Sequence, residues 1–471
     1  MPVSASLLLQ KRQRGEEFSA SEMRWFVDSC VEMRPEVLGP EQASALLMAM
    51  SLSESNGGLT TQETVYMAQA IADSGAKVQL PDDEPSVSLY SGVGDKTSLI
   101  VVPVCASCGI KVPKISDRGF IGGIVDKLEC IPGFRVKMPE QDFIQIVEEV
   151  NAAIVAPFPD IVPADEPLRR IRELLYISEN LPLMAASVVG KKLAGGTSSF
   201  LFDVKTGSGT ALADVNAAVS FAQKLVAAAR GTERSASAFV TSMHQPLGYA
   251  IGSYLELVEC LQILNGQHTR TGNLRDISFL LSAQVLLQAG KCSTLEEGYN
   301  MAVESITSGR AMESFRKMVE AQGGDLEFIA KALEPGPSPY TVERRIEVRV
   351  EPGDLEHIES ELPVDSTIDD ATRIVGIDTI VLGELSKKLG AFRSVASDNI
   401  DFGSGIELQR SLSEAVHPGD ILCTLYTNNA RTSDADLCKA ARKAFSFERG
   451  PVSAQPLIFA FIDGEGGVTN L

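Results

Sequence analysis

The stretch SLIVVPVCASCGIKVPKIS, residues 98–116, decides the fold class. It contains two runs rich in β-branched residues, separated by small residues. Short apolar runs of this kind are typical of buried strands, and the small residues between them suit a helix. We therefore predict a strand–helix–strand unit, which is the repeating element of an α/β layer with a mostly parallel sheet.

Further apolar runs extend this layer downstream. Buried strands are predicted at AAIVAP (152–157), SFLFDVK (199–205) and SAFVTSM (237–243). Each run is followed by a helical pattern, so that strand and helix alternate along the chain. We assign residues 76–165 and 197–338 to one large α/β domain.

The segment before this layer is predicted to be helical. Apolar residues recur at helical spacing in SEMRWFVDSCVEM (21–33, capped by Ser19 or Ser21), ASALLMAMSLS (43–53) and TQETVYMAQAIADSG (61–75, capped by Thr60 or Thr61). Residues 1–75 are therefore expected to form a small helical domain. A second helical stretch, 166–196, is expected to return to it.

Proline and glycine punctuate the chain at EPGPSP (334–339), where the α/β part is expected to end. Short alternating runs follow at YTVERRIEVRV (340–350), TRIVGIDTIVLG (372–383) and HPGDILCTLYT (417–427). They predict a separate C-terminal α+β domain over 340–471.

Composition and charge limit the classes of molecule that the protein is expected to bind. The 471 residues include 62 Asp and Glu against 42 Lys and Arg, a net charge of −20. Such a surface repels nucleic acid and anionic lipid. No window approaches 18 uninterrupted apolar residues, so no membrane span is expected. Without a secretory signal, the protein is expected in the cytoplasm with its eight cysteines as free thiols, the Cys105–Cys108 pair included.

Several segments carry residues suited to binding an anionic or polar ligand. Glycine-rich stretches present backbone N–H groups, which bind anions, at YSGVGDKTS (90–98), ISDRGFIGGIVDKLE (115–129) and FDVKTGSG (202–209). Arg172, Ser187 and Lys191 lie on the helical stretch between them. Ser187 and Lys191 are four residues apart and so share one helix face.

Taken together, these segments resemble the thymidine phosphorylase and pyrimidine-nucleoside phosphorylase family. The resemblance runs in the family's order over nearly the whole chain, through GVGDKTSLIVVPVCASCGIKVPKISDRG, GG-x-x-DKLE-x-IPGF, VPAD, LPLMAAS-x-x-x-KKLA, DVK-x-GSG and QPLG-x-A-x-G. It implies the three domains predicted above, with a substrate cleft between the helical and α/β domains. It also implies reversible phosphorolysis of a pyrimidine nucleoside, without a cofactor or a metal.

The resemblance further implies a homodimer that assembles through the helical segments near 5–50 and 166–196. The apolar residues Leu46, Leu47, Met48 and Met50 exceed what a three-helix domain is expected to bury alone.

The half of the site that would hold the base matches the family. Arg172, Ser187 and Lys191 stand at the positions of the family's pyrimidine-contacting Arg, Ser and Lys, with the spacing kept. Two cations and a hydroxyl suit the carbonyl oxygens and ring nitrogen of a pyrimidine, and they stabilise the base as it leaves with negative charge.

The half that would hold phosphate departs from the family. Val87, Ser88 and Leu89 replace the family's Lys, His and Ser, and a two-residue deletion leaves Ile121 where a Thr is usual. The phosphate contacts that remain in sequence are Ser98 and Ser116.

Lys114 is a candidate compensating cation in that half, since the family has an apolar residue there. The alternative for Lys114 is an exposed lysine at a strand end. Arg118 matches a family residue and is expected to be structural.

These residues predict a pentosyltransferase acting on the N-glycosidic bond of a pyrimidine nucleoside, with phosphorolysis very slow or absent. Water, or a substrate that carries its own anionic group, would then replace phosphate. One alternative is a non-catalytic paralogue that binds a pyrimidine. The other is a working thymidine or uridine phosphorylase whose phosphate site is rebuilt from other residues.

Overall fold

The computed structural model describes residues 3–471 apart from 53, 57, 81–84, 91–94, 117, 119–121, 211, 268, 269, 271, 337, 356–370, 394–398 and 454. Of residues 56 and 85–90 it describes only the backbone. Among the described residues, no helix has the length and apolar character needed to cross a bilayer.

The N-terminal segment is helical, as predicted. Its elements are α1 (Ala5–Gln13), α2 (Ala20–Glu32), α3 (Pro40–Met50), the 3-10 turn η1 (Glu54–Asn56) and α4 (Thr61–Asp73). Ser19 and Thr60 cap α2 and α4, and Glu22 and Glu63 complete a capping box at each. These reciprocal hydrogen bonds fix where the two helices begin.

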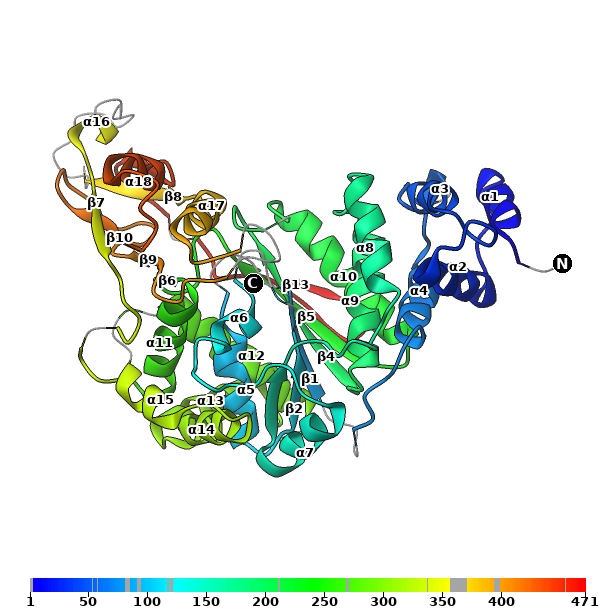
Figure 1. Ribbon diagram of the computed structural model, residues 1–471, viewed down its shortest axis with the longest axis horizontal. Coiled ribbons are helices and arrows are strands. Elements are labelled where there is room, and N and C mark those ends of the chain that lie inside the picture. Colours follow the sequence, from blue (N-terminus) through cyan, green and yellow to red (C-terminus); the bar gives the residue numbers. More distant parts are fainter. Residues whose placement is uncertain are drawn as a thin grey trace.

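Two later helices, α8 (Asp165–Leu174) and α9 (Leu181–Ala194), pack against this group (Figure 1). Helix α9 lies so close to α4 that a Cβ on Gly190 would stand 2.8 Å from the Ile71 side chain. The Asn180 amide, which caps α9, also donates to Ser51 O at 2.8 Å beyond the end of α3. The helical part of the molecule is therefore built from two separate stretches of sequence.

Beside these helices lies the large sheet, whose strand order is β1-β4-β5-β12-β13. Its strands are β1 (Pro85–Tyr90), β4 (Ser199–Thr206), β5 (Ser235–Ser242), β12 (Ile458–Ile462) and β13 (Val468–Asn470). The first three run parallel. A smaller parallel pair joins β2 (Val112–Ile115) and β3 (Ala152–Val155). Strands β3, β4 and β5 confirm the three downstream predictions.

Helices complete the α/β part of the chain. They are α5 (Ser98–Ser107), α6 (Ile124–Leu128), α7 (Glu140–Val150), α10 (Val215–Gly231), α11 (Ser253–Leu264), α12 (Gly272–Gln288), α13 (Leu295–Thr307), α14 (Arg310–Ala321) and α15 (Leu326–Ala332). Helix α10 packs on β4 and β5 and also on α9, so it joins the sheet to the helical part.

The strand predicted at the start of the 98–116 stretch is wrong. Residues 98–107 form one helix, α5, and the strand that precedes it is β1. Every residue from Ser98 to Ala106 is buried. A helix buried on all sides shows no amphipathic period, and its β-branched residues then look like those of a buried strand.

The C-terminal part contains β7 (Arg344–Arg349), α16 (Pro352–Leu355), β8 (Thr372–Ile377), α17 (Thr379–Leu389), β9 (Gly405–Leu408), β10 (Ile421–Thr427), α18 (Asp434–Arg442) and β11 (Phe445–Arg449). β7, β10 and β9 form an antiparallel sheet, to which the α/β part adds β6 (Ala250–Ile251). The second half of the run at 372–383 is helix α17, because Asp378 caps it, and is not strand.

The end of the chain leaves this C-terminal part. Strand β12 pairs antiparallel with β5 of the large sheet, and β13 pairs with β12. The sequence placed all of 340–471 in the C-terminal domain, whereas the structure returns its last two strands to the α/β sheet. All five residues of β12 are apolar, and buried Ala460 and Ile462 alternate with half-buried Phe459 and Phe461, so the run fits either sheet.

Candidate functional site

Ser187 and Lys191 meet at one carboxylate. The Ser187 hydroxyl donates to Asp165, and Lys191 Nζ lies 3.3 Å from Asp165 Oδ2. Asp165 is the first residue of α8, and the other two residues lie on α9. Sequence reasoning did not single out Asp165, although it closes the quoted VPAD motif. The contact depends on how α8 and α9 pack, which local sequence does not reveal.

Arg172 lies on the same face of α8 as Asp165, two helical turns further on. Arg172 is buried, with only 7% of its surface exposed. A buried guanidinium is always charged and needs partners of opposite polarity. Helices α8 and α9 thus bring Ser187 and Lys191 to the Asp165 carboxylate, and Arg172 lies two turns away from that carboxylate along α8.

Ser98 and Ser116 are the two residues that remain, in sequence, of the half predicted to hold phosphate. Ser98 is the first residue of the ten-residue helix α5, and its Oγ is buried with no hydrogen-bond partner among the residues that the structure describes. Ser116 follows β2, and its N–H donates to Val155 O at 2.9 Å. A helix N-terminus with an unused hydroxyl is a favourable environment for an anionic or polar group.

Lys114 is buried at 4% exposure, so the alternative of an exposed lysine at a strand end is wrong. Burial lowers the pKa of Lys114 well below its usual value, and the Lys192 charge lowers it further. Asp95 and Asp203 act in the opposite direction. Lys114 is therefore an internal amine whose charged form is disfavoured by burial, in a region that also contains Lys192, Asp95 and Asp203.

The two parts of the candidate site meet at Lys192. This residue follows Lys191 on α9, and its Nζ donates to Ile115 O at 3.3 Å, at the end of β2. Helix α9 is therefore in direct contact with β2, the strand that carries Lys114. Ile121 and the side chains of Val87, Ser88 and Leu89 lie outside the described residues, so their predicted roles stay predictions.

A second group with charges lies on the parallel strands β4 and β5. The Lys205 ammonium pairs with Asp203, and it donates to Thr241 Oγ1 at 2.9 Å. Thr241 Oγ1 in turn donates to Asp203 Oδ1 at 2.5 Å. All three residues are fully buried. The quoted DVK motif therefore supplies a closed ionic triad near the carboxyl ends of these strands.

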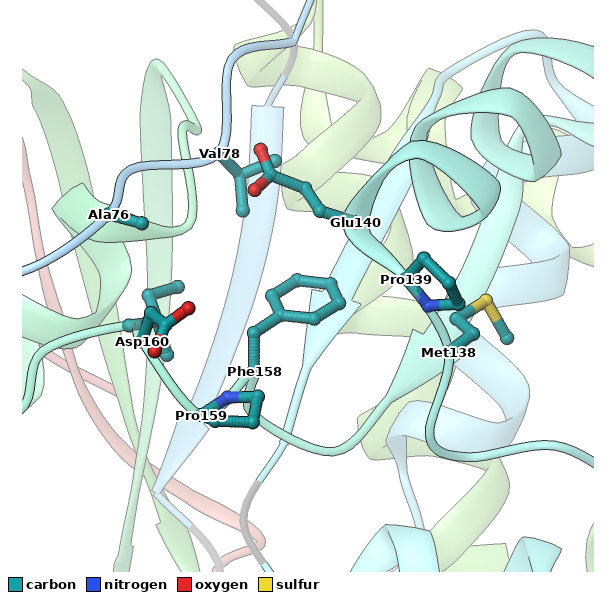
Figure 2. A pocket seen from close by; sticks show the side chains of 9 residues that line it. Ala76, Val78, Met138, Pro139, Glu140, Phe158, Pro159 and Asp160 are labelled. Carbon is teal, nitrogen blue, oxygen red and sulfur yellow. The ribbon is translucent and has the colours of Figure 1, made fainter.

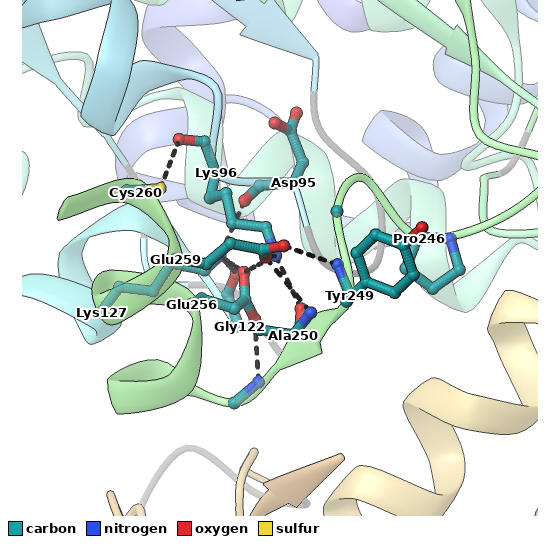
Figure 3. A network of polar contacts seen from close by, with 12 residues as sticks. Asp95, Lys96, Gly122, Lys127, Pro246, Tyr249, Ala250, Glu256, Glu259 and Cys260 are labelled. Atoms are coloured by element: carbon teal, nitrogen blue, oxygen red, sulfur yellow. Dashed lines mark hydrogen bonds and ion pairs between the residues drawn. The ribbon is translucent and has the colours of Figure 1, made fainter. Parts of the chain in front are cut away.

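A buried ionic network fixes the segment that leads into α5 (Figure 3). Lys96 Nζ donates to Ala250 O and to Glu259 Oε2, both at 2.7 Å. Burial disfavours the charged form of Lys96, but Glu259 and Glu256 outweigh this effect and raise its pKa. Lys96 therefore stays charged and holds the residues just before Ser98 in place.

A pocket of about 230 Å³ lies elsewhere, where the chain passes between the helical and α/β parts (Figure 2). Two hydrogen bonds cross there, from Ala76 N to Asp160 O at 2.9 Å and from Val78 N to Ala194 O at 2.8 Å. The Phe158 ring faces the pocket. No residue predicted for the candidate site lines it. Among the described residues, no group of three or more His, Cys, Asp or Glu side chains could hold a metal ion.

Three parts of the chain match described families. Residues 6–75 match the glycosyl transferase family, helical bundle domain, and residues 91–312 match the glycosyl transferase family, a/b domain. Residues 374–448 match the pyrimidine nucleoside phosphorylase C-terminal domain.

Curated relatives match along most of the chain. The pyrimidine-nucleoside phosphorylase of Staphylococcus aureus (strain MSSA476) is 31% identical over 432 residues, which cover 91% of this chain and 93% of that protein. The enzyme of the same name from Staphylococcus haemolyticus (strain JCSC1435) is 31% identical over 433 residues, with the same coverage.

A solved structure shares the fold at low sequence identity. The crystal structure of anthranilate phosphoribosyltransferase from Thermus thermophilus matches with a TM-score of 0.54 and 16% identity. The match covers 67% of this chain and 99% of that one.

Proposed function

The chain belongs to the pyrimidine-nucleoside phosphorylase family of glycosyl transferases, and from this membership we propose that it transfers the pentosyl group of a pyrimidine nucleoside. In this reaction the C1′–N bond breaks, and the base leaves with the electron pair. A nucleophile then bonds to C1′. The departing base gains negative charge, which nearby cations and hydrogen-bond donors stabilise.

The observation that carries this proposal is the cluster of Asp165, Ser187 and Lys191, with Arg172 on the same face of α8. Arg172 and Lys191 would donate to the carbonyl oxygens of the base. Ser187 would contact the ring nitrogen between them. Asp165 would hold Ser187 and Lys191 in place in the absence of substrate.

We propose that phosphorolysis is slow, since the sequence places Val87 and Ile121 where the family has a phosphate-holding Lys and a phosphate-contacting Thr, and Leu89 where it has a Ser that helps position the nucleoside. An aliphatic side chain strips water from a phosphate dianion without offering a hydrogen bond in return. Water, or an anionic group on the substrate itself, then serves as the nucleophile or fills the pocket.

A second candidate is phosphorolysis through a rebuilt site. It is favoured by the burial of Lys114 beside Lys192 and by the Ser98 hydroxyl, which has no hydrogen-bond partner among the described residues. In that case a bound phosphate would have to offset the burial that lowers the pKa of Lys114, so that Lys114 binds phosphate as a cation.

Product analysis separates these candidates. Release of uracil from uridine, or thymine from thymidine, is measured with and without phosphate. If the main proposal is right, the rate of base release shows no saturable dependence on the phosphate concentration. Saturable, phosphate-dependent release at about 1–10³ per second would establish the second candidate. Binding of uracil without release from any nucleoside would identify a non-catalytic binder.

The base site is tested separately by Arg172→Ala. Loss of a charged hydrogen bond should weaken uracil binding by about 1–3 kcal/mol in calorimetry. Unchanged affinity in this variant would remove Arg172 from the site.

A further inference from the structure

The DKLE motif of residues 126–129 has no role in the proposed chemistry, yet two of its charged residues are buried in the protein interior. Asp126 and Lys127 lie in the short helix α6 and are fully buried. Glu129 follows directly and is the C-cap of this helix. Burial of ions is costly unless each is closely partnered. Their partners therefore show what the motif holds together.

Lys127 joins two segments of the candidate site (Figure 3). Its Nζ donates to Asp95 O at 2.8 Å and to Gly122 O at 2.7 Å, and it lies 3.2 Å from Glu256 Oε2 on α11. Asp95 lies three residues before Ser98, and Gly122 lies two residues before the first residue of α6. One ammonium thus joins the segment that leads to Ser98 and the residues that lead into α6.

Asp126 connects the start of α6 to the C-terminal part. It accepts from the Gly123 N–H at 3.2 Å and from Arg118 Nη1 at 3.3 Å. The guanidinium of Arg393 also pairs with Asp126, and its Nη2 lies 3.8 Å from Glu129 Oε2. Arg393 lies just beyond α17, far from α6 in sequence, so this ion pair crosses between two parts of the fold.

The residue before Arg393 closes the same contact sterically. A Cβ placed on Gly122 would stand 2.4 Å from the Phe392 ring. Gly122 also has φ of +84°, a conformation that favours glycine. Phe392 itself is buried. The start of α6 therefore contacts the C-terminal part at two points. The Phe392 ring packs against Gly122, and the Arg393 guanidinium pairs with Asp126.

We propose that Arg393 is a positioning residue for the segment that carries Ser98, acting through Asp126 and Lys127 of α6. The inference rests on the proposed function for what Ser98 does, but not for the contact itself. A buried ion pair adds little net stability compared with apolar packing, so its main effect here is to fix geometry. The C-terminal part thus acts on the Ser98 segment through α6.

The positional claim is tested without a ligand. Hydrogen exchange is measured on the protein, on Arg393→Ala, on Arg393→Lys and on the control Arg442→Ala. Arg442 is a matched residue, since its side chain is 17% exposed against 13% for Arg393, but its partners Glu351 and Asp354 lie within the C-terminal part.

Exchange at residues 122–128 should rise in R393A, fall back in R393K, and stay unchanged in R442A. Equal exchange in R393A and the unaltered protein would overturn the inference. So would an equal rise in R442A, because a general loosening would then explain it.

The functional claim is tested by turnover and base binding together. In R393A, kcat for base release should fall about 10- to 100-fold, since small displacements at a reacting centre are costly. Uracil affinity should not change, and R393K should recover much of the rate. Unchanged kcat with altered exchange would overturn the functional half. If the unaltered protein releases no base at all, the proposed function fails, while the exchange result still decides the contact.

Discussion

A serine hydroxyl has one hydrogen, and Ser187 gives it to Asp165. The lone pairs of Ser187 Oγ are then what a ligand meets, so its partner on the base must be a donor. Uracil and thymine carry an N–H between their two carbonyl groups, whereas cytosine has a bare acceptor nitrogen there. If Ser187 faces the base as proposed, Asp165 makes the site selective for uracil and thymine.

Asp165→Asn tests this selectivity. The amide can donate to Ser187 and free its hydrogen, so the preference for uracil over cytosine should fall about tenfold, and uracil affinity should weaken by about 1–3 kcal/mol. Calorimetry with both bases measures the change. Glu166→Gln is the control, because Glu166 is adjacent but exposed and pairs with Arg169. An unchanged ratio in D165N would refute the assignment.

Lys114 makes a prediction about pH. Burial lowers its folded-state pKa, so between that value and the unfolded value near ~10.4 the unfolded chain binds more protons. The free energy of unfolding therefore rises with pH in that window, and the contribution is lost as pH falls through the folded pKa. Lys114→Met should flatten this rise in urea unfolding between neutral and alkaline pH. The exposed Lys137→Met should keep the slope of the unaltered protein.

At the scale of single elements, α5 shows what a sequence can and cannot predict. Strands β3, β4 and β5 could be predicted because each is a short apolar run between turns. Residues 99–102 have the same pattern but lie in a helix, since burial on all sides removes the period that distinguishes the two. Arg172, Ser187 and Lys191 could be predicted as site residues from the family resemblance, whereas the contacts of Asp165 and Arg393 join different elements of the fold and could not be predicted from local sequence.

Strand β12 makes the prediction that belongs to this scale. Ile462 is fully buried, and β12 continues the sheet beyond β5. Ile462→Ala should lower the free energy of unfolding by about 2–5 kcal/mol and raise hydrogen exchange in β5. Val468→Ala, on the exposed strand β13, should stay within about 0.5 kcal/mol. Destabilisation confined to β7–β11 would contradict the placement of β12.

At the scale of the whole molecule, apolar side chains remain uncovered at one end of the helical part. Leu174 is 69% exposed and Tyr176 is 96% exposed, at the end of α8. Met48 and Leu52, at the end of α3, are also exposed, and α3 contacts α8. Large apolar residues gathered on a surface are typical of association sites. We propose that a second copy of the chain covers them.

The sequence predicts a dimer interface that includes the apolar residues Leu46, Leu47, Met48 and Met50. Leu46, Leu47 and Met50 are instead buried within their own chain, so Met48 alone of these four faces outward. The exposed apolar residues that a second copy could cover lie instead at the ends of α3 and α8. Exposure of these residues depends on which helix covers which, and this could not be read from their hydrophobicity.

The double variant Leu174→Glu, Tyr176→Glu should convert a dimer to a monomer in light scattering at micromolar concentration. Two charges in an apolar interface are costly to bury. Ile380→Glu, an exposed apolar position on α17, should leave the mass unchanged. A monomer for the unaltered protein would end the proposal.

The division of the helical part into two stretches of sequence has a consequence during synthesis. Helices α1–α4 leave the ribosome first, but α9, which packs on α4, is made roughly 120 residues later. At about 5–20 residues per second, the apolar face of α4 waits on the order of 10 seconds for its partner. During that interval the nascent chain exposes Ile71 and its neighbours, which makes it a client for chaperones that bind apolar segments.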